Sequence, residues 1–568
     1  MRETLNQRWS AAIVETWLAQ GLEHAVICPG SRSTPLAFAL AQQKGLRCWS
    51  HIDERSAAFF ALGLSKASGV PTVVLCTSGS AGAHFLPAAI EAFHGNVPLI
   101  LVTADRPWEL QGFGAPQTME QPGLYGRFVR GAENLATPED TPPMFAQVRA
   151  VAARAFVTAA NAPRGPVHVN APFREPLAPT VTAAVSVPSQ TPRFTGARLR
   201  VADEAIDRVA KAIEHCERGL IVVGPRAPDA AFAEAVHALG EKLGFPLLAE
   251  AASNVRFGCV KAIAHYDAML RHAPFAKAHL PQVVLRFGGG LTPKTPQAWL
   301  DNSGARIFTF SDEGAYIDPQ HSSEEILIGE AADACRALSS RVKAASSSGY
   351  LASWTRAHDR VRQVLSVLPA LSEPWVAQAV AAALPERSQL VVSSSMPVRD
   401  LDAFANASKP GLKVFTNRAL NGIDGVVSTA LGISAGSNAP TSLLIGDVAM
   451  LHDLGGWAAA RRLGVGLNAI VINNDGGGIF HFLPVADSGA PFEEFFGTPH
   501  GTDFATVATL GGASYHRVDS VDQLVPALRS ATGKRRLVEI QTNRQENVKV
   551  HAQLFDAAAR ALGDGPWL

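Results

Sequence analysis

The chain has 568 residues, more than one hydrophobic core usually organises, and this length predicts about three domains of ~150–200 residues each. Hydrophobic residues make up 47% of the sequence and charged residues 18%, which is typical of a globular protein with large buried sheets. The 50 Lys and Arg residues balance the 50 Asp and Glu residues, so nothing in the composition indicates a nucleic-acid or polyanionic partner. Any anion must therefore be bound by locally placed arginines.

The N-terminal residues and the cysteines indicate where such a chain works. Residues 1–24 have the periodicity of an amphipathic helix rather than the basic-then-apolar order of a signal sequence. No apolar run reaches the about 18 residues that a membrane span requires. The cysteines form no C-x-x-C pair, and several lie in apolar strand-like runs; they are Cys28, Cys48, Cys76, Cys216, Cys259 and Cys335. We therefore expect buried, reduced thiols in a cytoplasmic protein that has no membrane partner.

Apolar runs of strand length alternate with helical stretches along the whole chain. Continuous Val, Ile and Leu runs separated by helices indicate parallel sheets covered on both faces, so we expect three sequential doubly wound α/β domains. Their predicted bounds are residues 1–180, 200–338 and 365–568, with linkers at 176–200 and 343–349. The candidate strands are residues 24–29, 72–77, 98–104, 166–170, 220–223, 283–287, 307–310, 390–392, 414–415, 443–445, 469–472 and 537–540.

The strongest local pattern lies in the predicted third domain. One apolar run ends at Gly446 and Asp447, a helical stretch follows, and a second run ends at Asn474 before three glycines. A carboxylate and an amide oxygen at two neighbouring strand ends are ligands that Mg²⁺ takes together with phosphate oxygens. Gly476 lets the backbone approach such a ligand closely. On its own, the pattern is equally compatible with an ordinary βαβ unit that has polar strand ends.

Three loops of the predicted first domain follow candidate strands and carry charged side chains. Residues 28–35 precede a helix, so their N–H groups and Arg32 can hold an anion. Glu54 begins a helix, where a carboxylate also simply favours the helix dipole. Arg106 follows the strand candidate 98–104. Because ligands of open parallel sheets bind beyond the carboxyl ends of the strands, we expect the three loops to line one edge.

These motifs together resemble those of the thiamine-diphosphate enzymes, which combine a strand-end Gly-Asp, an Asn 27 positions later and a Glu in an upstream α/β domain. More narrowly, the chain is similar to the 2-succinyl-5-enolpyruvyl-6-hydroxy-3-cyclohexene-1-carboxylate synthase family of menaquinone biosynthesis. The resemblance implies pyrimidine-binding, central and diphosphate-binding domains in that order. The matching text is PGSRSTPL (29–36), DERSAAFFALGLSKAS (53–68), TSGSA (77–81), TADRP (103–107), GAPQTMEQPG (114–123), SSSMPVRDLDA (393–403), TNRALNGIDG (416–425) and NNDGGGIFHFLP (473–484).

The family activity, taken as an implication, joins isochorismate to the succinyl semialdehyde unit of 2-oxoglutarate and releases CO₂. The implied cofactors are thiamine diphosphate, which acts as electron sink during CO₂ loss, and Mg²⁺ or Mn²⁺. Glu54 would share a proton with the cofactor's aminopyrimidine ring. The family further implies a homodimer or homotetramer whose active site lies at a subunit interface.

The resemblance also implies site residues. Both substrates carry two carboxylates, for which Arg is the suited partner, although which Arg binds which carboxylate stays open. The implied catalytic residues are Glu54, Arg32, Gln117, Arg399 and Arg418, and the implied substrate-binding residues are Ser31, Arg106, Lys294 and Ser395. The implied cofactor-binding residues are Glu54, Ser394, Gly446, Asp447, Asn474, Gly476, Ile479 and Phe480. Asp447, Asn474 and Gly476 would also hold the metal ion.

The chain departs from the family pattern at two positions. Val448 follows Gly446-Asp447 where thiamine-diphosphate enzymes usually have Gly, and Thr295 follows Lys294 where a second basic residue is common. Ile479 would support the cofactor or simply fill the core. His481, between two phenylalanines, is more typical of a packed side chain than of a base.

Two other functions remain open. One is another thiamine-diphosphate enzyme, such as a 2-oxoacid decarboxylase or an acetohydroxyacid synthase-like carboligase. The arginines of the first-domain loops disfavour it, because pyruvate carries a single carboxylate. The other is an inactive binding or regulatory subunit, which is disfavoured because the chain keeps Glu54, Asp447 and Asn474.

Overall fold

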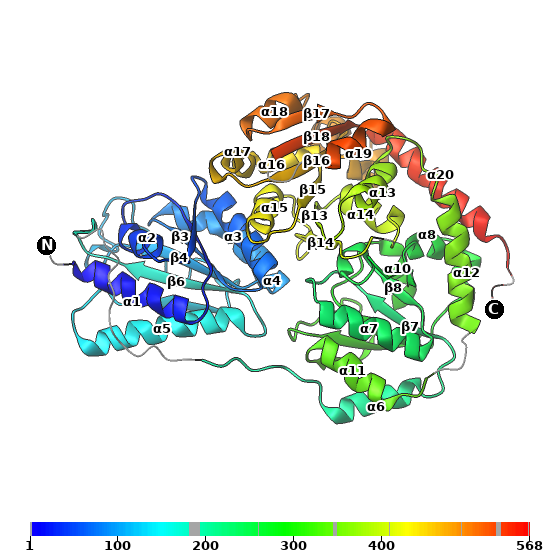
Figure 1. Cartoon of the computed structure of the whole chain (residues 1–568), viewed down its shortest axis with the longest axis horizontal. Helices are drawn as coiled ribbons and strands as arrows, with labels where there is room; N and C mark the ends of the chain where they lie inside the picture. Colours follow the sequence, from blue (N-terminus) through cyan, green and yellow to red (C-terminus); the bar gives the residue numbers. More distant parts are fainter. Residues whose placement is uncertain are drawn as a thin grey trace.

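The computed structural model describes residues 3–180, 194–259, 261–344, 349–407, 409–489, 491–529, 535–565 and 567. They form three sheets of six parallel strands, each covered by helices. Figure 1 shows the first domain at the left in blue and cyan, the central domain below right in green, and the third domain above both in yellow to red. No helix in these described ranges is long and apolar enough to cross a membrane.

The first sheet has the strand order β2-β1-β3-β4-β6-β5. Its strand β3 is buried along its whole length, and successive residues point to opposite faces. Val73 and Leu75 pack into one core under α1, α2 and α5, whereas Val74 and Cys76 pack into another that includes α3 and α4. The strands are β1 (His24–Ile27), β2 (Arg47–Ser50), β3 (Thr72–Cys76), β4 (Leu99–Asp105), β5 (Gly131–Asn134) and β6 (Pro166–Pro172). The helices are α1 (Leu5–Ala19), α2 (Thr34–Ala41), α3 (Glu54–Ser68), α4 (Leu86–Gly95) and α5 (Pro142–Ala160).

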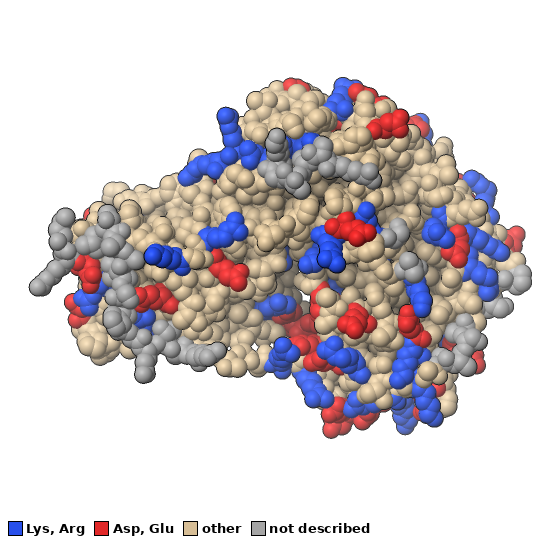
Figure 2. Space-filling model, in the orientation of Figure 1, with Lys and Arg blue, Asp and Glu red and all other residues tan. Residues whose placement is uncertain are grey.

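The central sheet has the order β12-β11-β10-β7-β8-β9. Its strands are β7 (Gly219–Val223), β8 (Leu247–Ala249), β9 (Ala262–Ile263), β10 (Val283–Phe287), β11 (Arg306–Ser311) and β12 (Ser323–Ile328). Its helices are α6 (Asp203–Ile213), α7 (Ala230–Leu243), α8 (Tyr266–Leu270), α9 (Ala273–Ala278), α10 (Lys294–Asp301) and α11 (Ala331–Arg341). Lys and Arg alternate with Asp and Glu on the face around α6 and α11 (Figure 2), and Arg341 of α11 pairs there with Asp203 and Asp207 of α6.

The third sheet has the order β14-β13-β15-β16-β18-β17. Its strands are β13 (Gln389–Val392), β14 (Lys413–Thr416), β15 (Thr441–Gly446), β16 (Leu467–Asn473), β17 (Ser514–Arg517) and β18 (Arg535–Gln541). The helices from the second linker onward are α12 (Gly349–Val364), α13 (Glu373–Ala383), α14 (Met396–Phe404), α15 (Val426–Ala435), α16 (Asp447–His452), α17 (Leu454–Leu463), α18 (Phe504–Leu510), α19 (Val521–Arg529) and α20 (Arg544–Leu562).

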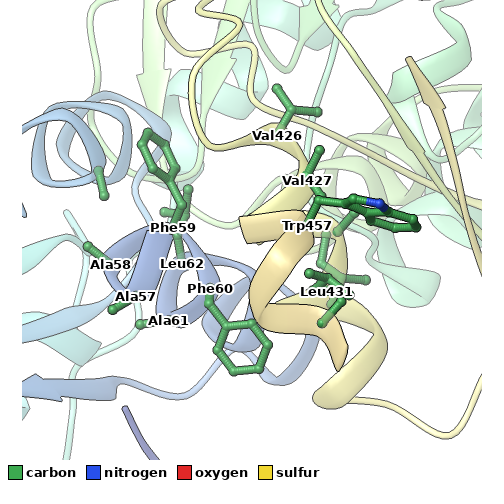
Figure 3. Packing of buried hydrophobic residues seen from close by; sticks show 14 of the residues in the cluster. Ala57, Ala58, Phe59, Phe60, Ala61, Leu62, Val426, Val427, Leu431 and Trp457 are labelled. Carbon is green, nitrogen blue, oxygen red and sulfur yellow. The ribbon is translucent and has the colours of Figure 1, made fainter. Parts of the chain in front are cut away.

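Helices α3 and α15 cross closely and join the first domain to the third. The approach depends on Gly63 and Gly432, because a Cβ built on Gly63 would lie 2.1 Å from the carbonyl oxygen of Thr429. Around this crossing, buried side chains of both domains form one continuous core. Figure 3 shows Phe59 and Phe60 on one side and Val427 and Leu431 on the other. The two domains therefore share a hydrophobic core instead of meeting at a polar surface.

All twelve predicted strands exist, and the three-domain parallel α/β architecture is confirmed. Sequence patterns missed β2, β5, β8, β9, β12 and β17, five of which lie at sheet edges. The helical stretch predicted after Gly446 is two helices, α16 and α17, separated at Asp453. The domain bounds stay predictions, and residues 181–193 and 345–348 of the predicted linkers lie outside the described residues.

The expectation that all the thiols are buried is wrong for half of them. Cys48 is exposed, and Cys216 and Cys259 are only half-buried. Cys48 lies in β2, an edge strand with three of its four residues exposed, so a strand position there gives no burial. All six cysteines are free thiols, as expected.

Replacing Gly432 by Ala is expected to destabilise the junction of the first and third domains. The new Cβ would lie 2.1 Å from the Phe60 carbonyl oxygen, a backbone atom that cannot move cheaply. Such overpacking costs about 1–3 kcal/mol and should lower the urea midpoint for loss of helical circular dichroism. Gly349→Ala is the control, since nothing lies within 4 Å of a Cβ at that helix start. Equal midpoints for the two variants would contradict the close crossing.

Candidate active site

The candidate residues of the first domain follow four adjacent strands of one sheet. Glu54 follows β2, Arg32 follows β1, Ser78 follows β3 and Arg106 follows β4, and these strands are neighbours in the order β2-β1-β3-β4. In a parallel sheet all carboxyl ends lie at the same edge. The structure therefore brings the three predicted loops together, as expected, and adds the loop that contains Ser78.

Two arginines converge at this edge. Arg32 is 8% exposed and donates from Nη1 to the carbonyl of Phe173 at 2.9 Å, whereas its Nε has no hydrogen-bond partner among the described residues. Arg106 donates to the hydroxyl of Ser78. Burial, and after it the charge of Arg106, lower the pKa of Arg32 from its ordinary value. Arg32 also lies 3.4 Å from the carboxylate of Glu175, and the two neighbouring guanidinium groups fit an anionic ligand at this edge.

Gln117 and Ser31 complete the first-domain cluster. Gln117 is exposed, has a left-handed backbone with φ of 57°, and donates from Nε2 to the carbonyl of Ser78 at 3.1 Å. Ser31 is exposed, and its carbonyl accepts from the amide of Thr34 at 3.1 Å. The structure thus places Gln117 beside the same serine that Arg106 contacts.

Glu54 is the first residue of α3 and is half-buried. The carboxylate of Asp53 caps this helix by accepting from the amides of Arg55 at 2.9 Å and Ser56 at 3.2 Å. Because Asp53 supplies the cap, the Glu54 carboxylate is not needed for it. Within the described parts of the chain, no hydrogen bond or ion pair joins Glu54 to Asp447.

Asp447 is 2% exposed and ties together the ends of β15 and β16. Its Oδ1 accepts from the amide of Val448 at 2.7 Å, and its Oδ2 accepts from the amides of Asn474 and Gly476, both at 3.0 Å. Val448 contributes only its N–H, so the contact does not need Gly there. The imidazole Nε2 of His500 also lies 3.3 Å from Oδ2.

The side chain of Asn474 is oriented by a buried carboxylate. Its Nδ2 donates to Oε1 of Glu373 at 2.9 Å, and the hydroxyl of Thr542 donates to the same oxygen at 2.9 Å. Burial, and then the charge of Asp400, raise the pKa of Glu373 to about 7. With its nitrogen held by Glu373, the amide presents Oδ1 on the other side, and this buried oxygen accepts no hydrogen bond among the described residues.

These oxygens fit a hard divalent cation. Asp447 offers Oδ1, which accepts from a single amide, Asn474 an amide oxygen without a partner in the described structure, and the loop at Gly476 a backbone carbonyl. Gly476 has φ of 141°, and a Cβ there would lie 1.9 Å from the carbonyl oxygen of Gly497, so only glycine fits. No group of three or more His, Cys, Asp or Glu side chains in the described residues is arranged to hold a metal ion. A cation at this site would therefore depend on backbone and ligand oxygens as well.

A second pair of arginines follows β13 and β14 in the same sheet. Arg399 on α14 donates from Nη1 to the carbonyl of Ser395 at 2.5 Å, and Ser395 has φ of 73°. Arg418 is half-buried, and its Nε and Nη1 have no hydrogen-bond partner in the described structure. Burial, and then the charge of Arg418, lower the pKa of Arg399. The order β14-β13-β15-β16 places this pair and the Asp447 loop at one sheet edge.

A buried carboxylate of the central domain, Glu250, lies within reach of the charge of Arg418. Glu250 accepts from the amide of Thr292 at 2.9 Å and from its hydroxyl at 2.5 Å. Burial, and then the charge of Asp402, raise the pKa of Glu250 to about 7, while Arg418 acts in the opposite direction. Lys294 begins α10 two residues after Thr292 and is exposed. The structure therefore brings Lys294 to the side of the central domain that faces the third.

The remaining predicted cofactor residues lie around the same loops. Ser394 is buried, and its hydroxyl donates to the carbonyl of Asn417 at 3.4 Å. Ile479 and Phe480 are half-buried in a short 3₁₀ turn, and Phe480 packs edge-on against Phe496 at 5.5 Å. His481 packs edge-on against Phe492 at 4.8 Å. Its Nε2 lies 3.7 Å from the carboxylate of Glu493, and the interpretation that His481 is not a base stays a prediction.

Sequence reasoning missed several residues that shape this site. Ser78 contacts both Arg106 and Gln117 and lies in the TSGSA stretch, so proximity to that motif was a usable signal. Glu373 begins a helix behind a serine cap and therefore looks like an ordinary first-turn carboxylate. Glu250 and Asp402 come from different domains, and no local sequence pattern predicts that the two buried carboxylates lie near each other.

Replacing Arg418 by Met should cost the ligand-free protein less stability than replacing Arg256 by Met. Its buried Nε and Nη1 lack partners, and each unsatisfied buried donor costs about 1–3 kcal/mol. Arg256→Met is the contrast, because Arg256 donates to the carbonyl of Ala249 and forms a 2.5 Å ion pair with Asp402. Breaking that buried pair should cost about 3–5 kcal/mol. Urea unfolding checks both, and an equal loss for the two variants would refute the difference.

Protein-family models match most of the chain. Residues 7–124 match the N-terminal thiamine pyrophosphate binding domain of thiamine pyrophosphate enzymes, residues 199–392 match their middle domain, and residues 403–542 match their C-terminal thiamine pyrophosphate binding domain. The first match covers β1 to β4 of the first sheet, the second covers the whole central sheet and β13, and the third covers the other five strands of the third sheet.

Curated relatives match over nearly the full length. A 2-succinyl-5-enolpyruvyl-6-hydroxy-3-cyclohexene-1-carboxylate synthase of Myxococcus xanthus is 48% identical over 99% of both chains. Proteins with the same name from Geobacillus kaustophilus and Chloroflexus aurantiacus are 41% and 40% identical and cover 98% of this chain. The matched region covers 98% of the Geobacillus protein and 96% of the Chloroflexus protein. The chain therefore belongs to the thiamine pyrophosphate enzymes and, within them, to the 2-succinyl-5-enolpyruvyl-6-hydroxy-3-cyclohexene-1-carboxylate synthase family.

Proposed function

We propose that the chain uses thiamine diphosphate to decarboxylate 2-oxoglutarate and adds the succinyl semialdehyde unit to isochorismate. The products are 2-succinyl-5-enolpyruvyl-6-hydroxy-3-cyclohexene-1-carboxylate and CO₂, and the pathway is menaquinone biosynthesis. The observation that carries the proposal is the near full-length similarity to synthases of this name, together with two arginine pairs at sheet edges. Thiamine diphosphate supplies the electron sink that the decarboxylation needs.

A divalent cation, Mg²⁺ or Mn²⁺, belongs to the same proposal. Asp447, Asn474 and Gly476 would hold it against the diphosphate of the cofactor. Support comes from the buried Oδ1 of Asn474, which accepts no hydrogen bond in the described structure, and from Glu373, which keeps that oxygen turned away from itself. Gly446, Ser394, Ile479 and Phe480 would contact the cofactor nearby.

The arginines account for substrates with two carboxylates each. Arg32 and Arg106, with Ser31 and Gln117, would bind isochorismate, and Lys294 would add a positive charge from the central domain. Arg399 and Arg418, with Ser395, would bind 2-oxoglutarate. In each pair, two positively charged guanidinium groups lie near each other, and their repulsion lowers the stability of the protein. A ligand with two carboxylates would offset this repulsion.

We further propose a homodimer or homotetramer in the cytoplasm, with Glu54 acting at a site completed by a second copy. Glu54 would hold a proton on the aminopyrimidine of the cofactor. Three apolar side chains near the first-domain loops support a covering subunit, since Ile52 is 73%, Trp108 72% and Phe113 84% exposed. The six free cysteines agree with a reducing compartment.

The decisive experiment supplies purified protein with Mg²⁺, thiamine diphosphate, isochorismate and 2-oxoglutarate, and follows CO₂ and the ligated product by mass. The proposal requires release of CO₂ and product in equal amounts. Efficient turnover of pyruvate without turnover of 2-oxoglutarate would favour the second candidate, another thiamine-diphosphate 2-oxoacid enzyme. No turnover of either, with the cofactor bound, would favour an inactive binding subunit.

Glu54→Gln should cut turnover by at least about 10²-fold, the scale of a positioned acid–base group. Folding and cofactor affinity should change little, because Asp53 and not Glu54 caps α3. Steady-state kinetics with isothermal calorimetry of the cofactor measures both. Turnover at the wild-type rate would remove Glu54 from the mechanism.

Asp447→Ala should abolish metal-dependent binding of thiamine diphosphate. The variant loses a carboxylate ligand and the acceptor that ties Asn474 and Gly476 to β15. Calorimetric titration with the cofactor, in the presence of Mg²⁺ and then of a chelator, checks this. An affinity equal to that of the wild type in both conditions would refute the role of Asp447.

A further inference from the structure

Arg418 stands at the start of a loop that has no regular structure. The loop covers residues 417–425, between the end of β14 at Thr416 and the start of α15 at Val426. Buried backbone groups in such a loop need partners from elsewhere in the fold. At residues 416–420, several of those partners come from two helices of the first domain of the same chain.

Lys66, in the last turn of α3, holds the first residues of this loop. Its side chain is 13% exposed, and its Nζ donates to the carbonyl of Thr416 at 2.7 Å and to Oδ1 of Asn417 at 2.8 Å. The Nδ2 of Asn417 donates onward to the hydroxyl of Thr429 in α15 at 3.0 Å. Lys66 thus fixes the two residues that precede Arg418.

Glu91, on α4, holds the two residues that follow. Its side chain is 7% exposed, and its carboxylate accepts from the amide of Ala419 at 3.2 Å and from that of Leu420 at 3.1 Å. The carboxylate also lies 3.8 Å from the Nζ of Lys66, so each buried charge has the other as its counterion. Burial lowers the pKa of Lys66, and Glu91 opposes that shift.

The guanidinium of Arg418 is not positioned by hydrogen bonds through Nε or Nη1, since both atoms lack partners in the described structure. Its place depends on the backbone that Lys66 and Glu91 hold on either side. We propose that Lys66 and Glu91 are positioning residues that preset Arg418 for the carboxylate of the 2-oxo acid substrate. This inference rests on the proposed function, in which Arg418 binds 2-oxoglutarate.

Alternatively, Lys66 and Glu91 could have a purely structural role, in which they only stabilise the contact between the first and third domains. The two roles differ in whether the effect passes through Arg418. If a residue acts through Arg418, replacing it has little effect on the kinetics once Arg418 has been replaced. If it only stabilises the domain contact, replacing it has the same effect with or without Arg418. A double-mutant cycle between Lys66→Met and Arg418→Met therefore separates them.

The experiment measures kcat and KM for 2-oxoglutarate at saturating isochorismate, with the holoenzyme. Lys66→Met should lower kcat/KM about 10–100-fold, mainly through KM, because a small misplacement of a binding group has effects of this size. In the Arg418→Met background the same change should cost less than about threefold. The KM for isochorismate should stay at its wild-type value.

Lys242→Met is the matched control. Lys242 also donates from Nζ to a backbone carbonyl of another element, that of Ser339 at 2.6 Å, but within the central domain. It should leave the kinetics unchanged. Glu91→Gln is the second variant, in case Lys66→Met does not fold, and should reproduce the rise in KM. Hydrogen exchange at the amides of residues 417–425 should be faster in Lys66→Met and in Glu91→Gln than in the wild type. In Lys242→Met it should be unchanged.

Two results would overturn the inference directly, and a third would remove its premise. One is an equal loss from Lys66→Met in the wild-type and Arg418→Met backgrounds. The other is unchanged exchange at residues 417–425 in both Lys66→Met and Glu91→Gln. Failure of the proposed function looks different, because the wild-type protein would then not convert 2-oxoglutarate and isochorismate at all. If the wild type is active but Arg418→Met keeps the wild-type KM, the role of Arg418 falls and the inference falls with it.

Discussion

The close crossing of α3 and α15 is the contact on which the arrangement of this protein depends. Gly63 and Gly432 let two helix backbones approach so closely that a Cβ on either would meet the other's backbone. The crossing fixes α3, and α3 carries Glu54 at its first residue and Lys66 in its last turn. One buried packing contact thereby sets the position of a predicted proton donor and of the lysine that holds the Arg418 loop.

The candidate site carries polar groups that the fold leaves without partners. Arg32, Arg418 and Asn474 each have a buried nitrogen or oxygen that makes no hydrogen bond in the described structure. Elsewhere the same chain satisfies comparable groups, as Arg256 does with Asp402 and the carbonyl of Ala249. Unsatisfied buried groups cost stability, and these three belong to residues that would contact charged ligands in the proposed function.

Much of the fold could be predicted from the sequence because buried parallel strands have a strong signal. Strands such as β3 and β16 are continuous apolar runs, buried on both faces, and periodicity finds them. Most edge strands lack this signal, since strands such as β2 and β17 are short and largely exposed. The positions of Asp447 and Arg106 could be predicted as well, because each follows a strand with a strong apolar signal. The carboxyl ends of neighbouring parallel strands lie at one edge of the sheet, which brings such residues near each other.

The parts that could not be predicted depend on contacts between distant segments. Glu373 orients Asn474, and Lys66 contacts Thr416, yet each looks locally like an ordinary helix-end charge. Sequence spacing carries no information on such pairs, because they form only when two domains or two ends of a domain meet. The DERSAAFFALGLSKAS and TNRALNGIDG stretches were both recognisable, but nothing in either indicates that the lysine of one binds the backbone of the other.

The shared core also constrains how the chain folds. Phe59 of α3 packs against Gly425 at the start of α15, so this side of α3 lacks its partner until the third domain has been synthesised. Parallel sheets and contacts between distant segments are intrinsically slow to form, and apolar surface exposed during that time favours association with other chains. During synthesis on the ribosome, this face of α3 therefore stays exposed while the whole central domain is being synthesised. The yield of native protein should accordingly depend on how well that face is shielded in the interval.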